Sequence, residues 1–308
     1  MTAPTPEPRS RPRRRSAVPY VLVVPALVAL LLGLAYPLVW QVSTSFKKFG
    51  LAQQFGKPPE WVGLANFADL VGNGTFWAVL IRSLVFCVVT AVVTVVIGVL
   101  VAQLMNAVGR VTRLVLQISM LLAWAMPVAA ATTVFIWLVD RRRGVVNYLL
   151  DKIPGIDTHR FDWLAHPGTF FLVASVLIVW MSVPFVSFAV YAGLTQVSGE
   201  VMEAAALDGA GAWQRFWRII VPMLRTVFAI VLLLQLIWDL RVFAQITLLQ
   251  DAGSKAGDFD LLGTYVYKLG AAANDYGMAS AVAIVVLVIT LAVSWVYVRE
   301  LLKEDEVR

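Results

Sequence analysis

Six apolar segments dominate this chain, and each is long enough to cross a lipid bilayer. The hydrocarbon core of a bilayer is about 30 Å thick, which takes roughly 20 residues of helix. Backbone groups in lipid must find hydrogen-bond partners within their own segment, so such spans are helices. The sequence therefore predicts an all-α polytopic membrane protein with six transmembrane helices. They lie at Val18–Val42, Ser83–Leu104, Leu114–Val139, Phe170–Leu194, Met223–Leu249 and Met278–Val298.

Composition agrees with this fold class. Hydrophobic residues make up 60% of the 308 residues and charged residues only 14%, with a mean hydropathy of +0.79. The basic RPRRRS stretch before the first span resembles the start of a secretory signal, but the span exceeds the roughly 7–15 apolar residues of a signal. We therefore expect a retained anchor, with a disordered basic tail at 1–17, one membrane domain of six spans at 18–298 and a short tail at 299–308.

Basic residues near the ends of the spans predict the orientation, because they favour the cytoplasmic side. With both termini inside, the basic tail, Arg110, Arg113, Arg215 and Arg218 all lie inside. Anionic lipid there accounts for the formal net charge of +6 without nucleic acid. Arg141–Arg143 run against the bias on the outer rim, where an acidic protein patch or lipid headgroups would explain them equally well.

Residues for catalysis or metal binding are missing from the expected patterns. Cys87 is the sole cysteine and lies within the second span, while His159 and His166 do not have a zinc spacing. The chain contains no phosphate-binding G-x-x-x-x-G-K-[ST] loop, no G-x-S-x-G elbow and no H-E-x-x-H. We expect no enzyme activity, metal or cofactor on this chain, so a nucleotide that drives it would bind another chain.

A polar interruption separates the fourth and fifth spans at Glu203–Pro222, EAAALDGAGAWQRFWRIIVP. It predicts a short Ala-rich helix, a turn at Asp208–Gly209 and a second helix ending near Pro222. Glycine at 209 suits the left-handed conformation that ends many helices. One face of the second helix is apolar, and we expect at least one of its aromatic side chains to pack on the protein's own spans. The residues of this face are Trp213, Phe216, Trp217 and Ile220.

This interruption resembles the cytoplasmic signature of the permease subunits of bacterial ABC importers. That signature begins with Glu-Ala-Ala, continues through Asp-Gly-Ala and Phe, and closes on an apolar-x-x-Pro. The matching residues here are Glu203, Ala204, Ala205, Asp208, Gly209, Ala210, Phe216, Ile219 and Pro222. The resemblance implies that residues 198–222 form the EAA coupling helix region, which contacts an ATPase subunit.

Four further stretches are similar to the carbohydrate-importing branch of that family. They are Trp61–Phe67 (WVGLANF), Trp137 with Gly144–Asn147, Ala192–Leu194 before the signature, and Tyr276–Ala281 (YGMASA). One departure is Leu248–Gly253, LLQDAG, where the family often has T-G-G-P.

The resemblance also implies partners and cargo. Two permeases pair, two ATPase subunits bind ATP and Mg, and an extracytoplasmic sugar-binding lipoprotein delivers a di- or oligosaccharide of the malto, cello or chito type. Glu203 would accept a bidentate arginine contact from the ATPase; alternatively, it is an exposed carboxylate favoured by the helix dipole. The protein would then reside in the cell membrane with both termini in the cytoplasm.

Charged residues within the fifth span point to a substrate path. A charge at mid-bilayer costs about 2.5–3.5 kcal/mol, so Asp239 and Arg241 should face protein or water. We expect a path lined by Trp238 and Asp239, with Trp180 and Phe185 as further candidates, the indole of Trp238 stacking on a sugar ring. The alternatives are an ion pair between chains, or an Arg241 that reaches the membrane surface.

Two prolines, Pro127 and Pro184, should interrupt the third and fourth spans, either as hinges or as ordinary features of membrane helices. Other functions remain open. A permease for peptide, phosphate or polyol would share most of these features. A stand-alone secondary transporter would show inverted repeats or a chain of ionisable residues through the spans, and neither is evident beyond Asp239 and Arg241.

Overall fold

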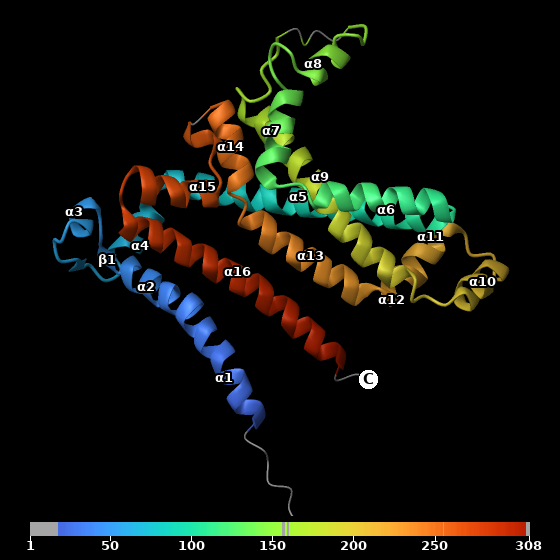
Figure 1. Cartoon of the computed structure of the whole chain (residues 1–308), viewed down its shortest axis with the longest axis horizontal. Coiled ribbons are helices and arrows are strands. Elements are labelled where there is room, and N and C mark those ends of the chain that lie inside the picture. The colour runs from blue at the N-terminus through green and yellow to red at the C-terminus, as the bar shows by residue number, and fades with distance from the viewer. Residues whose placement is uncertain (1–17, 156–157, 159, 255, 306–308) are drawn as a thin grey trace, which may run out of the picture.

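The computed structural model describes residues 18–155, 158, 160–254 and 256–305. The basic tail expected at residues 1–17 lies outside this range. The regular secondary structure of the described chain is helical apart from two short antiparallel strands, β1 (Lys47–Lys48) and β2 (Glu60–Trp61). The all-α class is therefore confirmed (Figure 1).

Four helices of the described chain are long and apolar enough to cross a membrane, and two bent pairs also qualify when each pair counts as one span. The pairs bend by 99° and 77°. The straight spans are α1 (Val18–Leu30) continued through η1 (Leu31–Ala35) and α2 (Tyr36–Ser45), α5 (Gly74–Ala107), α9 (Pro167–Leu194) and α16 (Tyr276–Asp305). The bent pairs are α6 (Arg110–Trp124) with α7 (Val128–Leu138), and α11 (Ala212–Arg215), η2 (Phe216–Ile220) and α12 (Val221–Met223) with α13 (Arg225–Leu240).

Shorter helices occupy the connections between these spans. They are α3 (Leu51–Gln54), α4 (Ala65–Gly72), α8 (Val145–Leu150), α10 (Gly199–Leu207), α14 (Ala244–Ala252), η3 (Gly257–Phe259), α15 (Leu262–Tyr267) and η4 (Lys268–Ala272). Because α16 runs to Asp305, the tail expected from residue 299 begins as a continuation of the last span.

The two prolines behave differently. Pro127 caps α7 at the 99° break from α6, so the predicted interruption of the third span is confirmed. The prediction for Pro184 is wrong, because α9 continues through it. An internal proline removes one backbone hydrogen bond, and here close packing of α9 on α5 holds the helix together on both sides: Val183, Pro184 and Val186 are all buried.

The expectation of one unbroken helix over Met223–Leu249 is also wrong. The helix α13 ends at Leu240, residues 241–243 leave the helical conformation, and α14 starts a new helix at Ala244. The new direction lets Ile246 and Leu249 bury themselves in a cluster with α7 and α9. Gly263 of α15 permits the turn, since a Cβ there would lie 2.7 Å from the carbonyl oxygen of Val242.

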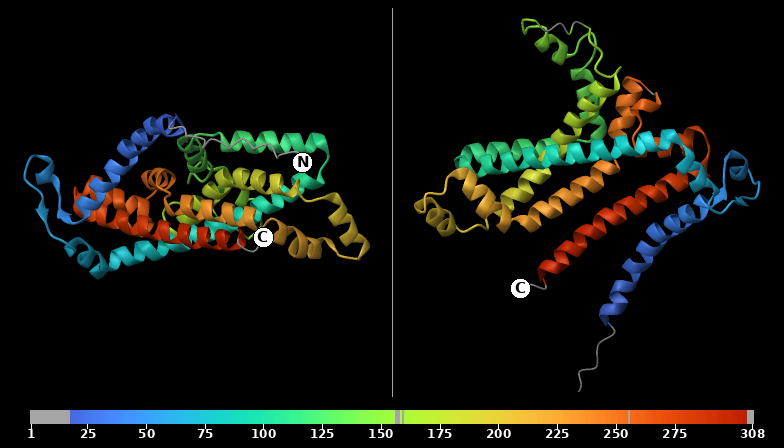
Figure 2. Two further views of the ribbon diagram at one scale, coloured as in Figure 1. Left: turned by 90° about the horizontal axis from the view of Figure 1, so that it is seen from below. Right: turned by 180° about the vertical axis from the view of Figure 1, so that it is seen from behind.

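The core lies along α5 and α9, which pack closely over much of their length. They approach closely at Gly98, where a Cβ would lie 2.4 Å from Cγ1 of Val186. Small residues let membrane helices approach in this way, because packing rather than the hydrophobic effect holds them together in lipid. The helix α13 lies beside α5, and α16 contacts both α13 and α2 (Figures 1 and 2).

The bundle has two distinct ends. One end, which we call the α10 end, carries residues 107–110 and 195–224. The other, which we call the hairpin end, carries residues 46–72, 253–254 and 256–275. The two lie at opposite extremes of the long axis (Figure 1). The first span leans away from the other helices toward its amino terminus, and none of its most apolar window is buried in the described chain.

Candidate functional site

The polar interruption forms an exposed helix–turn–helix at the α10 end. The helix α10 ends in two backbone hydrogen bonds: Gly209 N donates to Ala206 O (3.1 Å), and Ala210 N donates to Ala205 O (2.9 Å). Gly209 has φ +81°, the left-handed conformation that this motif requires. Asp208 occupies the cap position before it. The predicted turn at Asp208–Gly209 is therefore confirmed.

Side chains on α10 and α11 divide between solvent and bundle. Glu203, Ala204 and Asp208 are exposed. Leu207 is 90% exposed at the tip, and the sequence pattern did not single it out, although an apolar residue between an Ala-rich helix and Asp-Gly is a recognisable signal. Among the aromatics, Trp213 is 74% exposed and Trp217 51%, while Phe216 packs against the core cluster of α5, α9 and α13. The expectation of one inward-facing aromatic is thus confirmed.

The second helix of this element connects to the bundle through a bend. It passes through a π-helical turn at Phe216–Ile220 and through Pro222 in α12, and then turns by 77° into α13. Ile220 packs beside Phe216 on the cluster that contains Leu194 and Leu224. Movement of α10 would therefore reach α13 through packed side chains and a continuous backbone.

The far part of α13 lines a cavity of about 600 Å³. Both helix breaks border it, at Met126 and Val128 between α6 and α7, and at Arg241–Ala244 between α13 and α14. Non-helical backbone at membrane depth is tolerated where it is buried in protein or lines a water-filled cavity. The two breaks and the cavity therefore belong to one feature. Its remaining lining residues are Trp124, Ile178, Met181, Ser182, Trp238, Asp239 and Gln245.

Asp239 is the polar centre of this cavity wall. Its side chain is buried, and Oδ1 accepts a hydrogen bond from Nε2 of Gln235 (2.8 Å), one turn earlier on α13. Its Oδ2 and the Oε1 of Gln235 have no hydrogen-bond partner among the described residues. Buried polar oxygens without partners are costly, so a hydrogen-bond donor would be favoured there.

The four residues predicted for the path do not share one cavity. Trp238 and Asp239 line the cavity together with Arg241. Phe185 packs edge-on against the ring of Trp238, with the two ring centroids 5.0 Å apart. Trp180 instead lines a neighbouring, mostly apolar cavity of about 700 Å³ between α5, α6 and α9. Gln235, Trp124 and Ser182 were missed; a glutamine four residues before a buried aspartate was a usable signal.

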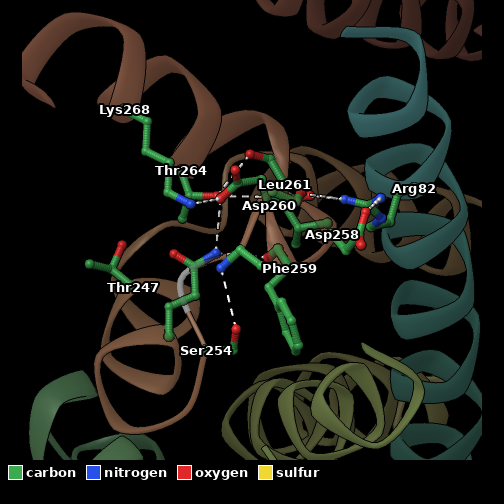
Figure 3. A network of polar contacts seen from close by, with 12 residues as sticks. Arg82, Thr247, Ser254, Asp258, Phe259, Asp260, Leu261, Thr264 and Lys268 are labelled. Carbon is green, nitrogen blue, oxygen red and sulfur yellow. Dashed lines mark hydrogen bonds and ion pairs between the residues drawn. The ribbon is translucent and has the colours of Figure 1, made fainter. Parts of the chain in front are cut away.

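A polar network fixes the hairpin end beyond this cavity (Figure 3). Asp260 is buried. Its Oδ1 forms an ion pair with Nζ of Lys268 (2.7 Å) and accepts hydrogen bonds from Nε2 of Gln250 (3.0 Å) and Oγ1 of Thr264 (3.3 Å). Arg82 on α5 donates to the carbonyl oxygens of Gly257 and Asp260. Burial, and secondarily the charge of Asp260, raise the pKa of nearby Tyr265. The network ties the segment after α14 to α5.

Two stretches that carry the sequence resemblance meet at the hairpin end. Nδ2 of Asn66, from the WVGLANF stretch, donates to the carbonyl oxygens of Ser45 and Lys47. Gly277, from the YGMASA stretch, donates its N–H to Phe49 O, and a Cβ at this position would lie 2.4 Å from Lys47 O. Both motifs thus hold the end of the first span against the start of the last.

The glycine and asparagine at 144 and 147 are structural as well. A Cβ on Gly144 would lie 2.4 Å from Asp140 O. Asn147 donates to Phe161 O (2.9 Å) and accepts from Nε1 of Trp163 (2.7 Å), which closes the loop between α8 and α9. Asp140 accepts the N–H groups of Arg142 and Arg143, and these bonds lower the pKa of its carboxyl group.

Comparison with known proteins agrees with this architecture. Residues 94–299 match the family described as "Binding-protein-dependent transport system inner membrane component". The chain is 40% identical to the diacetylchitobiose uptake system permease protein DasB of Streptomyces coelicolor, over 97% of this chain and 90% of that protein. It is 27% identical to the trehalose/maltose transport system permease protein MalF of Thermococcus litoralis, over 93% and 94%. A similar fold is found in one chain of a bacterial alginate ABC transporter, whose structure was solved in complex with an alginate pentasaccharide-bound periplasmic protein. The TM-score is 0.77 at 24% sequence identity, and the match covers 91% of this chain and 92% of that chain.

Proposed function

Because this chain belongs to the family of binding-protein-dependent transport system inner membrane components, we propose that it is the permease subunit of an ATP-driven importer of a di- or oligosaccharide. It forms half of the translocation path. The observation that carries the proposal is the exposed α10–Gly209–α11 element, which projects from the bundle yet is packed through Phe216 onto the helices that line the cavity.

The proposed topology has six spans, with each bent pair counted as one, and both termini in the cytoplasm. The α10 end then faces the cytoplasm and carries the EAA coupling helix. Arg110 and Arg113 lie in the first turn of α6, which starts at this end, and Arg215 and Arg218 lie in α11 and η2, in keeping with the preference of basic residues for the cytoplasmic side.

The proposed assembly adds a second permease, two ATPase subunits that bind ATP and Mg, and an extracytoplasmic sugar-binding protein. This chain contributes no catalytic group. Glu203 and Leu207 meet the ATPase surface, the carboxylate as a partner for arginine and the leucine as an apolar anchor. The most apolar window of the first span, none of which its own chain buries, is available to the second permease.

Coupling in this proposal follows the packed connection from α10 to the cavity. When the ATPases close, they displace α10, and the rigid α11–α12 segment passes the displacement to α13. Since Trp238 and Asp239 lie on α13, the cavity wall moves with the ATPase. The helix breaks that border the cavity act as hinges, and the network around Asp260 keeps the hairpin end in place.

The cargo is a sugar because the cavity combines an aromatic face with polar residues. Trp238 offers a face on which a pyranose ring can stack, and Ser182, Asp239 and Arg241 belong to the same lining, where hydrogen bonds to sugar hydroxyls can form. The relatives named above are transport proteins for diacetylchitobiose, trehalose/maltose and alginate. A chito-type disaccharide is the first candidate to test, followed by malto- and cello-type sugars.

The test is ATP-dependent uptake of labelled disaccharides by vesicles that contain the complete transporter. The variant Glu203→Lys should abolish uptake while the protein stays in the membrane, and Gly209→Pro should do the same because it removes the Gly209 N–H bond and the left-handed turn. Glu200→Lys, one turn earlier on α10, is the matched control and should retain most of the uptake. Normal uptake by Glu203→Lys and Gly209→Pro, or ATP-independent uptake by this chain alone, would refute the proposal; uptake of peptide, phosphate or polyol would refute the sugar assignment.

A further inference from the structure

The carboxyl group of Asp239 and the amide of Gln235 form an incomplete pair on α13. Both residues are buried, with exposures of 3% and 0%, and one hydrogen bond joins them, from Nε2 of Gln235 to Oδ1 of Asp239 (2.8 Å). The second oxygen of each group, Oδ2 of Asp239 and Oε1 of Gln235, has no hydrogen-bond partner among the described residues. An ionised carboxylate and an amide oxygen are both acceptors, so these two atoms have no proton to share.

The donors that α5 brings close to this pair already have other acceptors. The hydroxyl of Thr90 lies near the carboxyl of Asp239, but a hydroxyl has a single proton, and Thr90 donates it to the carbonyl oxygen of Phe86, 2.6 Å away. The thiol of Cys87 donates to the carbonyl oxygen of Leu236 (3.2 Å). Neither side chain therefore supplies the hydrogen bond that Oδ2 lacks.

No cation of the described chain forms an ion pair with Asp239. Arg82, the only basic residue of α5, instead binds the loop at the hairpin end, and Arg241 is exposed at the end of α13. The other two spans that contact α13 have no ionisable side chain over residues 167–190 of α9 and 277–296 of α16. An isolated carboxylate buried in such surroundings is unfavourable, and it is neutralised by taking up a proton.

The space around the two oxygens selects a proton over a water molecule or a metal ion. A water-sized molecule reaches neither Oδ2 of Asp239 nor Oε1 of Gln235. The described residues also contain no group of three His, Cys, Asp or Glu side chains that could hold a metal ion. A proton on Oδ2 needs no such room, and it turns one of the two acceptors into a donor. A carboxylic acid and a primary amide can then close a ring of two hydrogen bonds.

We propose that Asp239 is a proton-binding site and carries its proton in this structure. The proton comes from water, the Nε2–H of Gln235 donates to Oδ1, and the new O–H at Oδ2 donates to Oε1 of Gln235. Gln235 is then a positioning residue that holds the acid in one orientation. Among the lining residues of the cavity, Arg241 is left as the one ionised side chain. Because both members of the pair lie on α13, the pair moves with this helix as a unit, whatever the cargo.

The test is infrared spectroscopy of the complete transporter at pH 7, because a protonated carboxyl group has a C=O band that a carboxylate lacks. A polyoxyethylene ether detergent contributes neither ester carbonyls nor sugar, and sugar is left out because Asp239 also lines the cavity. Exposed carboxyl groups titrate near pH 4 and are ionised under these conditions, roughly a thousandfold over. The spectrum of the unmodified transporter minus that of Asp239→Asn should contain one acid C=O band. The asparagine amide can still donate to Oε1 and accept from Nε2 of Gln235, so this variant removes only the titrating group.

Gln235→Leu tests the pairing itself. Without the amide, the acid C=O of Asp239 loses its hydrogen bond, so its band should move to higher frequency. Gln235→Met keeps the length of the side chain and should give the same shift, which preserves the test if the leucine variant does not assemble. The matched control is Gln245→Leu, which removes another glutamine of the same cavity lining and should leave the band in place.

A carboxylate band of Asp239 at pH 7, in place of the acid band, would overturn the proposal. If that carboxylate band moved when choline replaced Na⁺, a cation rather than a proton would occupy the pair. An acid band with the same frequency in the unmodified transporter, Gln235→Leu and Gln235→Met would refute the ring with Gln235. The measurement needs neither sugar nor ATP, so its outcome is independent of the uptake assay.

Discussion

Replacing Asp260 by asparagine should weaken the hairpin end far more than the same change two residues earlier. The variant Asp260→Asn keeps a side-chain oxygen for Gln250 and Thr264 but loses the charge that Lys268 faces at 2.7 Å. The side chain of Asp260 is only 5% exposed, whereas that of Asp258 is 81% exposed and lies 3.8 Å from Arg82. The variants Asp260→Asn and Asp258→Asn thus compare a buried with an exposed ion pair in one loop (Figure 3).

The expected magnitudes follow from this difference in burial. A hydrogen bond to a charged group contributes roughly 1.5–3 kcal/mol, and the partial exposure of Lys268 places this one at about 2 kcal/mol. The exposed pair of Asp258 should contribute roughly 0–1 kcal/mol. At about 2–4 °C per kcal/mol, Asp260→Asn should lower the apparent melting midpoint by roughly 4–8 °C.

The assay is thermal unfolding of the purified protein in detergent, combined with hydrogen exchange of residues 250–268. Exchange should rise in this segment for Asp260→Asn and hardly change for Asp258→Asn. The double variant Asp260→Asn/Lys268→Met should lose less stability than the sum of its single variants, because the interaction is lost only once. Equal melting of the Asp260→Asn and Asp258→Asn proteins, or additive single variants, would refute the claim that this ion pair holds the loop.

Three further predictions follow from the other sites. Asp239→Asn should reduce uptake by raising KM for the sugar, while the ATPase rate stimulated by the binding protein stays near normal; a KM unchanged from that of the unmodified transporter would contradict a path role. Gly209→Val should strain the turn by roughly 1–2 kcal/mol and uncouple ATP hydrolysis from uptake, whereas Gly199→Ala, in α10, should not; the ratio of ATP hydrolysed to sugar imported distinguishes them. The pKa of Asp140 is lowered, so its contribution to the stability of the Arg142–Arg143 turn is complete above the unfolded pKa of about 3.9 and disappears as the pH falls through the folded value. The hydrogen-exchange protection factors of residues 142 and 143, which correct for the intrinsic pH dependence of exchange, should therefore fall at acid pH, and Asp140→Asn should lower them already at neutral pH.

The local geometry of the helix–turn–helix around Gly209 could be predicted because it depends on neighbours in the sequence. A glycine after an Ala-rich helix can adopt φ +81° wherever the chain is placed, and an apolar face with 3.6-residue spacing must pack on something. The spans were predictable for a similar reason, since length and hydropathy decide whether a helix is stable in lipid.

Packing between helices decided where the helices break and which predicted residues share a cavity. Pro127 and Pro184 look alike in the sequence, yet only the first breaks its helix, because α5 supports α9 along its length whereas α7 turns away to pack on α14. The end of α13 at Leu240 depends on Gly263 and on the burial of Ile246 and Leu249, residues that no local pattern connects with Arg241. The separation of Trp180 from Trp238 into two cavities has the same origin.

The sequence by itself determined that this chain is a helical membrane protein with a polar helix–turn–helix at Glu203–Pro222, because bilayer thickness and backbone hydrogen bonding leave a stretch of apolar residues no other stable form. Only the tertiary structure decided where the helices break, which polar groups face the cavity at Asp239, and how Asp260 and Arg82 close the hairpin end. Those features depend on contacts between residues up to 178 positions apart, and in lipid such contacts are selected by close packing and by the satisfaction of buried polar groups.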